Sequence, residues 1–273
     1  MSRSLPALIL MAATATAATV THDIVYAKRG SLELKLDASV PDGAGPFPAV
    51  IIVHGGGFMR GNKVTYVPPM FPPLTKAQFA WFTIDYRLAP EFKLPTPVED
   101  VVSAIEWVHS HAAEYKVDRR RIALLGESAG AFLVDYAAMV VPKQWPVAAV
   151  VSFYGPHDLL YQAKEMRLSD GAKAVTGVQE LNAEGERRLR ELSPYYMVRK
   201  GLPPFLLLHG TADEQVIYEQ SPRFCQALQA QGVACELYTL PGARHGMGSW
   251  EQHEDQQGYK AVVVEWLKKT LTK

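Results

Sequence analysis

The sequence predicts an α/β protein with a mostly parallel sheet of eight strands and helices on both faces. Five continuous apolar runs, and a sixth that is less purely apolar, recur along the 273 residues. Unbroken apolar runs are typical of strands that helices cover on both faces. Between them lie segments with apolar residues at helical spacing. This alternation favours parallel strands joined by right-handed crossovers.

The first two strands are expected to form an antiparallel hairpin. Residues 32–40 carry apolar side chains at every second position, as in a strand with one buried face, and residues 24–28 can pair with them. The six runs predicted as the other strands are residues 48–53, 79–84, 121–125, 147–153, 203–208 and 234–240.

Helical stripes cover residues 98–112, the region around Phe224 and Leu228, and residues 259–267. The first crossover, residues 66–74, differs because it contains four prolines, which remove backbone donors and clash with a preceding helical turn. We therefore expect an irregular or very short helix there.

Residues 155–199 form a connection of about 45 residues, far longer than ordinary connections between strands. We expect a small cap at about residues 155–200, with a charged helix at 180–192. Apolar residues in it look scattered, which predicts a small, wet cap. Its basic residues are Lys164, Arg167, Lys173, Arg187, Arg188 and Arg190.

Composition narrows the range of partners. The chain has 28 basic and 28 acidic residues, which gives no indication of nucleic acid or an anionic membrane surface as a partner. Residues 1–18 resemble an export signal, with Arg3, an apolar stretch at 5–13 and a small-residue cleavage site at 15–17. The alternative is a disordered cytosolic N-terminus. Residues 19–273 are expected to form one domain without stable membrane insertion, because no other stretch reaches ~18 uninterrupted apolar residues.

The motif Gly126-Glu127-Ser128-Ala129-Gly130 follows a predicted strand and precedes a predicted helix. A sharp strand-to-helix turn of this kind presents a serine hydroxyl above a sheet, and the flanking glycines allow the tight turn. The sequence therefore predicts that Ser128 is a nucleophile.

A serine nucleophile needs a base, and the base needs a carboxylate to orient it. Asp213 and His245 each follow a predicted strand downstream of Ser128, in the order Ser, Asp, His. Asp158 also follows a strand and competes for the role of the acid, and His253 competes for that of the base.

The glycines of His54-Gly55-Gly56-Gly57-Phe58 follow another strand. Bare backbone N–H groups there can point at an oxygen that carries negative charge, as in an oxyanion hole. The alternative is a turn rich in glycine for its backbone angles alone. A phosphate-binding loop fits this segment less well, because no Gly-Lys-Ser/Thr follows the glycines.

With these motifs in order, the chain resembles α/β-hydrolase esterases of the hormone-sensitive-lipase-like and bacterial carbohydrate esterase-like groups, which include acetylxylan and feruloyl esterases. Further matching motifs are Asp85-Tyr86-Arg87-Leu88-Ala89-Pro90-Glu91, Ser193-Pro194, His209-Gly210-Thr211-Ala212-Asp213 and Gln220-Ser221, and the resemblance spans about residues 46–248. It implies the α/β-hydrolase fold, hydrolysis of carboxylic esters without a cofactor, and an oxyanion hole formed by Gly56, Gly57 and Ala129.

The predicted function is therefore an exported, periplasmic or extracellular serine carboxylesterase that hydrolyses short-chain or aromatic acyl esters through an acyl-enzyme. Its substrate would be a small ester or an acylated carbohydrate, because the resemblance extends to secreted enzymes that remove acetyl or feruloyl groups from plant polysaccharides. Alternatives are a serine peptidase, a thioesterase or lactonase, and a non-catalytic binding protein of the same fold.

Large side chains next to the predicted catalytic loops are candidate walls of the substrate pocket, with ordinary packing as the alternative. They are Phe58, Met59, Tyr66, Tyr154, Met247 and Trp250.

The chain has two cysteines, Cys225 on a predicted helix and Cys235 at the start of the following strand. Helix and strand run antiparallel over similar lengths, so the two thiols can lie side by side. They form either a disulfide, which suits an exported protein, or two buried free thiols. Two cysteines without a histidine cluster predict no metal site.

Overall fold

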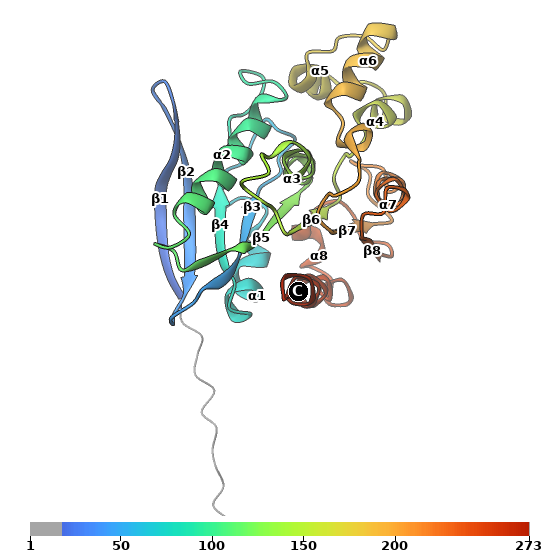
Figure 1. Cartoon of the computed structure of the whole chain (residues 1–273). Coiled ribbons are helices and arrows are strands. Elements are labelled where there is room, and N and C mark those ends of the chain that lie inside the picture. The colour runs from blue at the N-terminus through green and yellow to red at the C-terminus, as the bar shows by residue number, and fades with distance from the viewer. Residues whose placement is uncertain (1–17, 273) are drawn as a thin grey trace, which may run out of the picture.

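An eight-stranded sheet runs through the protein in the computed structural model, which describes residues 18–272. The strand order is β1-β2-β4-β3-β5-β6-β7-β8 (Figure 1). β1 pairs with β2, and β2 with β4, in antiparallel fashion, and all other pairs are parallel. The predicted hairpin followed by a parallel sheet is confirmed.

The strands are β1 (Ala18–Arg29), β2 (Leu32–Pro41), β3 (Phe47–Val53), β4 (Ala80–Ile84), β5 (Val117–Glu127), β6 (Ala149–Phe153), β7 (Phe205–Gly210) and β8 (Cys235–Leu240). Two of them start earlier than their apolar runs predict. β1 is an exposed edge strand that pairs through its backbone, and β5 begins with the charged residues 118–121, so neither extension has an apolar signature.

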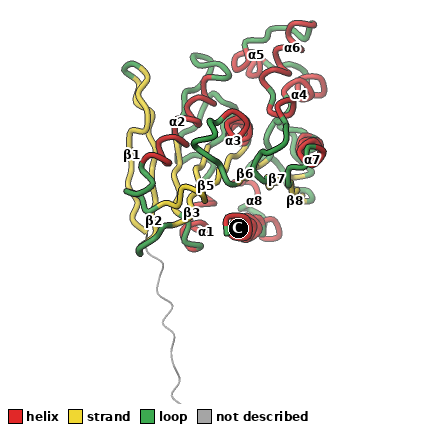
Figure 2. Tube along the Cα trace, in the orientation of Figure 1, coloured by secondary structure: helices red, strands yellow, loops and turns green. Residues whose placement is uncertain are grey.

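The helices cover both faces of the sheet. They are α1 (Phe71–Lys76), α2 (Thr96–Ser110), α3 (Ala129–Val140), α4 (Leu159–Met166), α5 (Asp170–Thr176), α6 (Ala183–Leu192), α7 (Gln220–Ala230), α8 (Met247–Trp250) and α9 (Tyr259–Leu271), with 3-10 turns η1 (Pro68–Met70), η2 (Pro194–Met197) and η3 (Glu254–Gln256). Figure 2 shows how they alternate with the strands along the chain.

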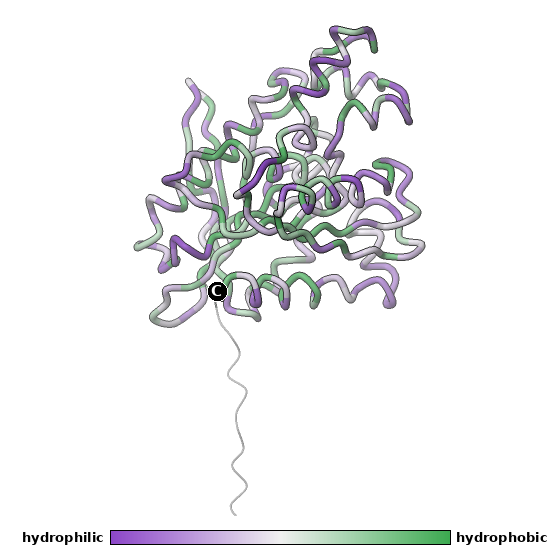
Figure 3. The backbone as a smooth tube through the Cα atoms, turned by 45° about the vertical axis from the view of Figure 1, so that its right-hand side comes forward, coloured by the Kyte–Doolittle hydropathy of each residue, from purple (hydrophilic) through white to green (hydrophobic). Residues whose placement is uncertain are grey.

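Alternate residues of the central strands enter two separate cores. On β3, Ile51 and Val53 pack with α2, α3 and α7, whereas Val50 and Ile52 pack with α1, α8 and α9. This period of two is what a strand buried on both faces produces. The apolar colouring in Figure 3 is accordingly strongest along the strands in the middle of the molecule.

The proline-rich crossover folds as the short pair η1 and α1. Pro72 and Pro73 lie in the first turn of α1, where backbone N–H groups have no intrahelical partner, so the helix tolerates them there. The expectation of a very short helix is confirmed.

The long insertion forms α4, α5, α6 and η2, which project above the edge of the sheet at the upper right of Figure 1. The charged helix begins at Ala183, three residues later than predicted, because the Asn182 side chain accepts the N–H of Gly185 and caps its first turn.

Residues 1–17, which hold nearly all of the predicted export signal, lie outside the described residues, and Ala18 is the first residue of β1. Between residues 18 and 272, the structure contains no helix with the length and apolar character needed to cross a membrane. Cys225 and Cys235 are joined in a disulfide that ties α7 to β8.

Candidate active site

Ser128 lies at the sharp turn between β5 and α3. Its backbone has φ 54° and ψ −118°, a conformation that residues with a side chain rarely adopt. A Cβ at Gly130 would collide with the Val53 carbonyl, so glycine is required for α3 to pack this closely on β3. The turn is held by the Ser128 N–H, which donates to the Phe153 carbonyl at 2.9 Å.

His245 joins Ser128 to Asp213. Its Nε2 lies 2.9 Å from the Ser128 Oγ, and its Nδ1 lies 2.6 Å from the Asp213 Oδ2. The Asp213 side chain is fully buried and the His245 side chain is 11% exposed. The structure therefore brings together the three residues singled out from the sequence, with a hydrogen-bonded path from carboxylate to hydroxyl.

The Asp213 carboxylate is fixed from both oxygens. Its Oδ1 accepts the backbone N–H groups of Gln215 and Val216, at 2.8 and 2.9 Å. Burial would raise the pKa of Asp213, but hydrogen bonds from His209, His245 and the Val216 N–H hold that pKa well below its usual value. Asp213 is thus a charged carboxylate that can orient and stabilise an imidazolium.

The glycine loop after β3 lies beside Ser128. Gly56, Gly57 and Ala129 all line the same cavity as Ser128 and His245. Gly56 has φ 97°, and a Cβ on it would collide with the Arg60 carbonyl, so the loop needs glycine there. Within residues 18–272, no acceptor contacts the N–H groups of these three residues, which leaves them available to a substrate oxygen.

Glu127, the neighbour of Ser128, is buried behind the turn and accepts the Gly55 N–H. Burial raises the pKa of Glu127 to about 7. The His245 imidazole and the Gly55 N–H oppose this rise. Glu127 therefore links the two loops of the site instead of only packing beneath the turn.

A cavity of about 600 Å³ extends from Ser128 to the cap. Four of the six predicted wall residues line it: Phe58, Met59, Tyr66 and Met247.

Tyr154 and Trp250 do not line this cavity, so their prediction as pocket walls is wrong. Both are fully buried. The Tyr154 ring packs against the His245 ring with centroids 4.7 Å apart, and its hydroxyl accepts the Met247 N–H. The Trp250 indole donates to the Arg244 carbonyl. Both therefore support the His245 loop from behind, a role that proximity in sequence does not distinguish from contact with substrate.

The inner side of the cap is largely apolar. Apolar residues gather there because helices α4, α5 and α6 turn one face to the cavity, while most of the basic residues form ion pairs on the outside, such as Lys164 with Glu186. The apolar cap residues that line the cavity are Leu159, Ala163, Met166, Leu168, Ala172, Val175 and Leu189. The apolar residues that look scattered in the sequence thus gather on one side of the cap, because the three helices turn the same face to the cavity.

The competing candidates lie elsewhere. Asp158 caps α4 by accepting the Tyr161 N–H and pairs with Arg223. His54 is buried, stacks on Tyr86, and has its pKa lowered to about 4 by burial. His253 is an exposed residue just before η3.

A second serine, Ser221, also lies within reach of histidines, 2.8 Å from the His209 Nδ1 and 3.4 Å from the His157 Nε2. It is fully buried on α7 and lines no part of the cavity, so a substrate cannot reach its hydroxyl. Among the described residues, no cluster of three or more His, Cys, Asp or Glu side chains is arranged to hold a metal ion.

Ser128 lies on a turn between a strand and a helix, and the acid and the histidine lie on later loops of the same sheet. These features place the protein in the α/β-hydrolase class. Residues 36–228 match the BD-FAE family model. The chain therefore belongs to the BD-FAE family of α/β-hydrolase esterases.

Similar proteins agree with this placement. The esterase LipC of Mycobacterium tuberculosis is 30% identical over 74% of this chain and 53% of its own length. A probable isoprenylcysteine alpha-carbonyl methylesterase of Arabidopsis thaliana is 28% identical over 83% of this chain and 51% of its own. The chain thus spans about half the length of the curated relatives it matches.

Solved structures match over almost the whole chain. A truncated carbohydrate esterase from gut microbiota has a TM-score of 0.81 and 25% identity, covering 96% of this chain and 99% of its own. A propionate-bound thermophilic esterase of Thermogutta terrifontis has a TM-score of 0.74 and 29% identity, covering 92% and 94%.

Proposed function

We propose that this protein is a serine carboxylesterase that hydrolyses esters of short or aromatic acids through an acyl-enzyme, with acylated carbohydrates as its natural substrate class. The observation that carries this proposal is the contact of Ser128, His245 and Asp213 at 2.9 and 2.6 Å, at one end of an accessible cavity. A serine, a base and an orienting acid in this order perform acyl transfer.

In the first half of the reaction, the Ser128 Oγ attacks the ester carbonyl and the His245 Nε2 takes the hydroxyl proton. Asp213 stabilises the imidazolium that forms. The carbonyl oxygen becomes an oxyanion and accepts hydrogen bonds from Gly56, Gly57 and Ala129. Losing one such donor typically raises the barrier by about 3–4 kcal/mol.

The intermediate then collapses, and His245 gives its proton to the departing alcohol. In the second half, His245 takes a proton from water, which attacks the acyl group on Ser128. The second tetrahedral intermediate breaks its bond to the Ser128 Oγ, His245 returns its proton to that oxygen, and the acid leaves.

The cavity supports the acyl part of the proposal. The inner face of the cap is apolar, and each buried CH₂ group of an acyl chain gains roughly 0.8 kcal/mol when it leaves water. The same surface can accept the ring of an aromatic acid such as ferulate. The carbohydrate part is supported by the family, whose name denotes acetyl and feruloyl esterase activities, and by the gut carbohydrate esterase.

The test uses a fluorophosphonate probe and then a series of p-nitrophenyl esters. Wild-type protein should be labelled and should cleave acetate and butyrate esters, whereas Ser128→Ala should be folded, unlabelled and inactive. Acetate or ferulate released from acetylated or feruloylated xylan would support the carbohydrate proposal. Absence of labelling in the wild type would contradict the esterase proposal as a whole.

Export to an oxidising compartment is also part of the proposal. Its support is the pattern of residues 1–18 and the disulfide between Cys225 and Cys235, since disulfides persist mainly in oxidising environments. Expression in a bacterium followed by N-terminal sequencing of the periplasmic fraction tests it. A protein that stays in the cytoplasm and begins at residue 1 would contradict it.

A further inference from the structure

Asp213 contacts a second histidine in addition to His245. The His209 Nε2 lies 3.3 Å from the Asp213 Oδ2, the same oxygen that faces His245, and 3.0 Å from the Val216 carbonyl. His209 is fully buried near the end of β7 and does not line the cavity. It therefore touches the acid of the triad but has no access to substrate.

The hydrogen bonds around His209 determine where its proton lies. Both groups that face Nε2, a carbonyl and a carboxylate, are acceptors, so Nε2 must carry the hydrogen. Nδ1 lies 2.8 Å from the Ser221 Oγ. In a neutral ring Nδ1 is then an acceptor, and the Ser221 hydroxyl must donate to it.

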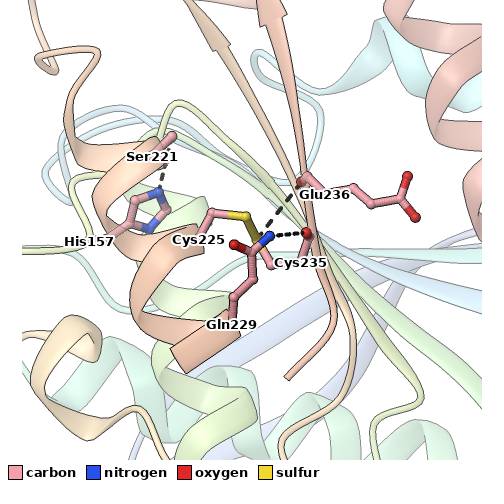
Figure 4. Close-up of a disulfide and its surroundings, with 6 residues drawn as sticks. All are labelled: His157, Ser221, Cys225, Gln229, Cys235 and Glu236. Carbon is pink, nitrogen blue, oxygen red and sulfur yellow. Dashed lines mark hydrogen bonds between the residues drawn. A yellow bond between two sulfur atoms is a disulfide. The ribbon is translucent and has the colours of Figure 1, made fainter. Parts of the chain in front are cut away.

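Ser221 is held in turn by a buried pair. The His157 Nε2 lies 3.4 Å from the Ser221 Oγ, and the His157 Nδ1 lies 2.8 Å from the Asp135 Oδ2. Figure 4 shows His157 pointing at Ser221, which lies on α7 one turn before the disulfide-bonded Cys225. In a neutral His157 ring the hydrogen lies on Nδ1, facing the Asp135 carboxylate, and Nε2 is an acceptor. The single Ser221 hydrogen then goes to the nearer acceptor, the His209 Nδ1 at 2.8 Å, and not to the His157 Nε2 at 3.4 Å.

We propose that His209 is a positioning residue for the reaction, and that the Ser221 hydroxyl anchors the Nδ1 side of its ring. The His209 Nε2–H donates to the Val216 carbonyl at 3.0 Å and faces the Asp213 Oδ2 at 3.3 Å. Its positive end therefore attracts this carboxylate oxygen, while the N–H groups of Gln215 and Val216 hold Oδ1. Asp213 can then orient the His245 ring toward Ser128. This inference rests on the proposed esterase function, because its kinetic effect is on the triad.

Two substitutions of His209 test its contact with Asp213 and its contact with Ser221 separately. The side-chain amide nitrogen of glutamine can occupy the position of Nε2, so His209→Gln keeps a donor for Asp213. The amide nitrogen of asparagine corresponds to Nδ1, so His209→Asn keeps a partner for Ser221 but loses the donor. Both variants place an uncharged amide at the same buried position, so each serves as a control for the loss of stability in the other.

We expect His209→Gln to keep kcat on p-nitrophenyl butyrate within about threefold of wild type, and His209→Asn to lower kcat at least about tenfold, the order expected for a lost charge-assisted hydrogen bond. KM should stay within about twofold in both, because His209 touches no substrate. Equal activities, or more activity in His209→Asn than in His209→Gln, would overturn the proposal.

Ser221→Ala tests the anchor of the His209 ring, with Thr83→Val as its control. Thr83 is equally buried, its hydroxyl donates to the Lys63 carbonyl, and it makes no hydrogen bond to His209, Ser221 or His157. Both variants lose a buried hydroxyl and should lose similar stability in urea. Only Ser221→Ala should lower kcat, by about three- to tenfold; equal kcat losses in the two would contradict the role of Ser221.

Long-range ¹H–¹⁵N spectra of protein labelled on histidine provide a readout independent of turnover. At pH 8, His209 should show one tautomer with hydrogen on Nε2 in the wild type and in Ser221→Ala, because the Val216 carbonyl and the Asp213 carboxylate both face Nε2. A hydrogen on Nδ1 of wild-type His209 would overturn the inference. If the wild type cleaves no ester, the proposed function fails, while these spectra still decide the arrangement of His209.

Discussion

The Glu127 Oε1 accepts the backbone N–H of Gly55 across 2.6 Å. This hydrogen bond joins the turn that carries Ser128 to the glycine loop that carries Gly56 and Gly57. Both partners are deeply buried, so water cannot replace either of them. The Glu127 side chain therefore helps to fix the nucleophile relative to the oxyanion donors, although it takes no part in the proposed chemistry itself.

Removing that side chain should lower activity without removing any catalytic group. Glu127→Ala leaves the buried Gly55 N–H unpaired, a penalty of about 1–3 kcal/mol, and releases the glycine loop. We expect kcat on p-nitrophenyl butyrate to fall by about 10- to 100-fold. Glu127→Gln retains a carbonyl acceptor and should stay within about tenfold of wild type. Equal activity in Glu127→Ala and wild type would show that the loop is held by other contacts.

The ionisation of Glu127 should also affect stability as pH changes. Burial raises its pKa from 4.5 to about 7, so between these values the folded protein keeps a proton that the unfolded chain has lost. The unfolded state binds fewer protons, and stability must fall as pH rises through this window. The shift corresponds to a loss of up to about 3 kcal/mol.

Glu127→Gln cannot ionise and provides the comparison. Its free energy of unfolding in urea, minus that of wild type, should increase from pH 4.5 to pH 8 and stay constant below pH 4. Other buried carboxyls, such as Asp135, titrate in both proteins and cancel in the difference. A difference independent of pH would mean that Glu127 ionises normally in the folded state.

Much of this fold is readable from the sequence because its signals are local. Each central strand is a continuous apolar run, and Ser128, Asp213 and His245 all follow such runs, so parallel pairing brings them to one edge of the sheet. The observed ends of the strands differ from the predicted ends where backbone pairing extends beyond the apolar residues. The charged start of β5 is an example.

What the sequence did not predict depends on which way side chains point. Tyr154 and Trp250 lie close to catalytic residues in the sequence, but their side chains face the core. The apolar residues of the cap look scattered in the sequence, and only the folded helices bring them to one face. The contact of His157 with Ser221 joins residues 64 positions apart, and no spacing rule indicates it.

The backbone at Ser128 allows a test of strain separate from catalysis. Its φ of 54° with ψ of −118° costs a residue with a side chain about 1–3 kcal/mol. Ser128→Ala and Ser128→Gly should both be inactive, but Ser128→Gly should be the more stable of the two by about 1 kcal/mol in urea, since glycine adopts this conformation freely. A less stable Ser128→Gly would indicate that the turn is unstrained.

The apolar inner face of the cap should control which acyl groups fit. Ala172 on α5 lines the cavity, and Ala172→Phe should fill part of it. We expect kcat/KM for p-nitrophenyl decanoate to fall at least about tenfold relative to acetate, which corresponds to about 1.4 kcal/mol. Ala174→Phe is the control, because Ala174 lies on the same helix but does not line the cavity. The same loss in both variants would argue against a selective pocket.

The disulfide between Cys225 and Cys235 should stabilise the fold through the short loop it closes, with a sequence separation of 10 residues. Restricting such a loop in the unfolded chain is worth about 2–3 kcal/mol. The double variant Cys225→Ala/Cys235→Ala should therefore unfold at lower urea concentration by this amount. Dithiothreitol should destabilise the wild type toward the same value and leave the double variant unchanged. A wild type whose urea midpoint is unaffected by full reduction, verified by thiol titration of the unfolded chain, would show that the crosslink contributes nothing to stability.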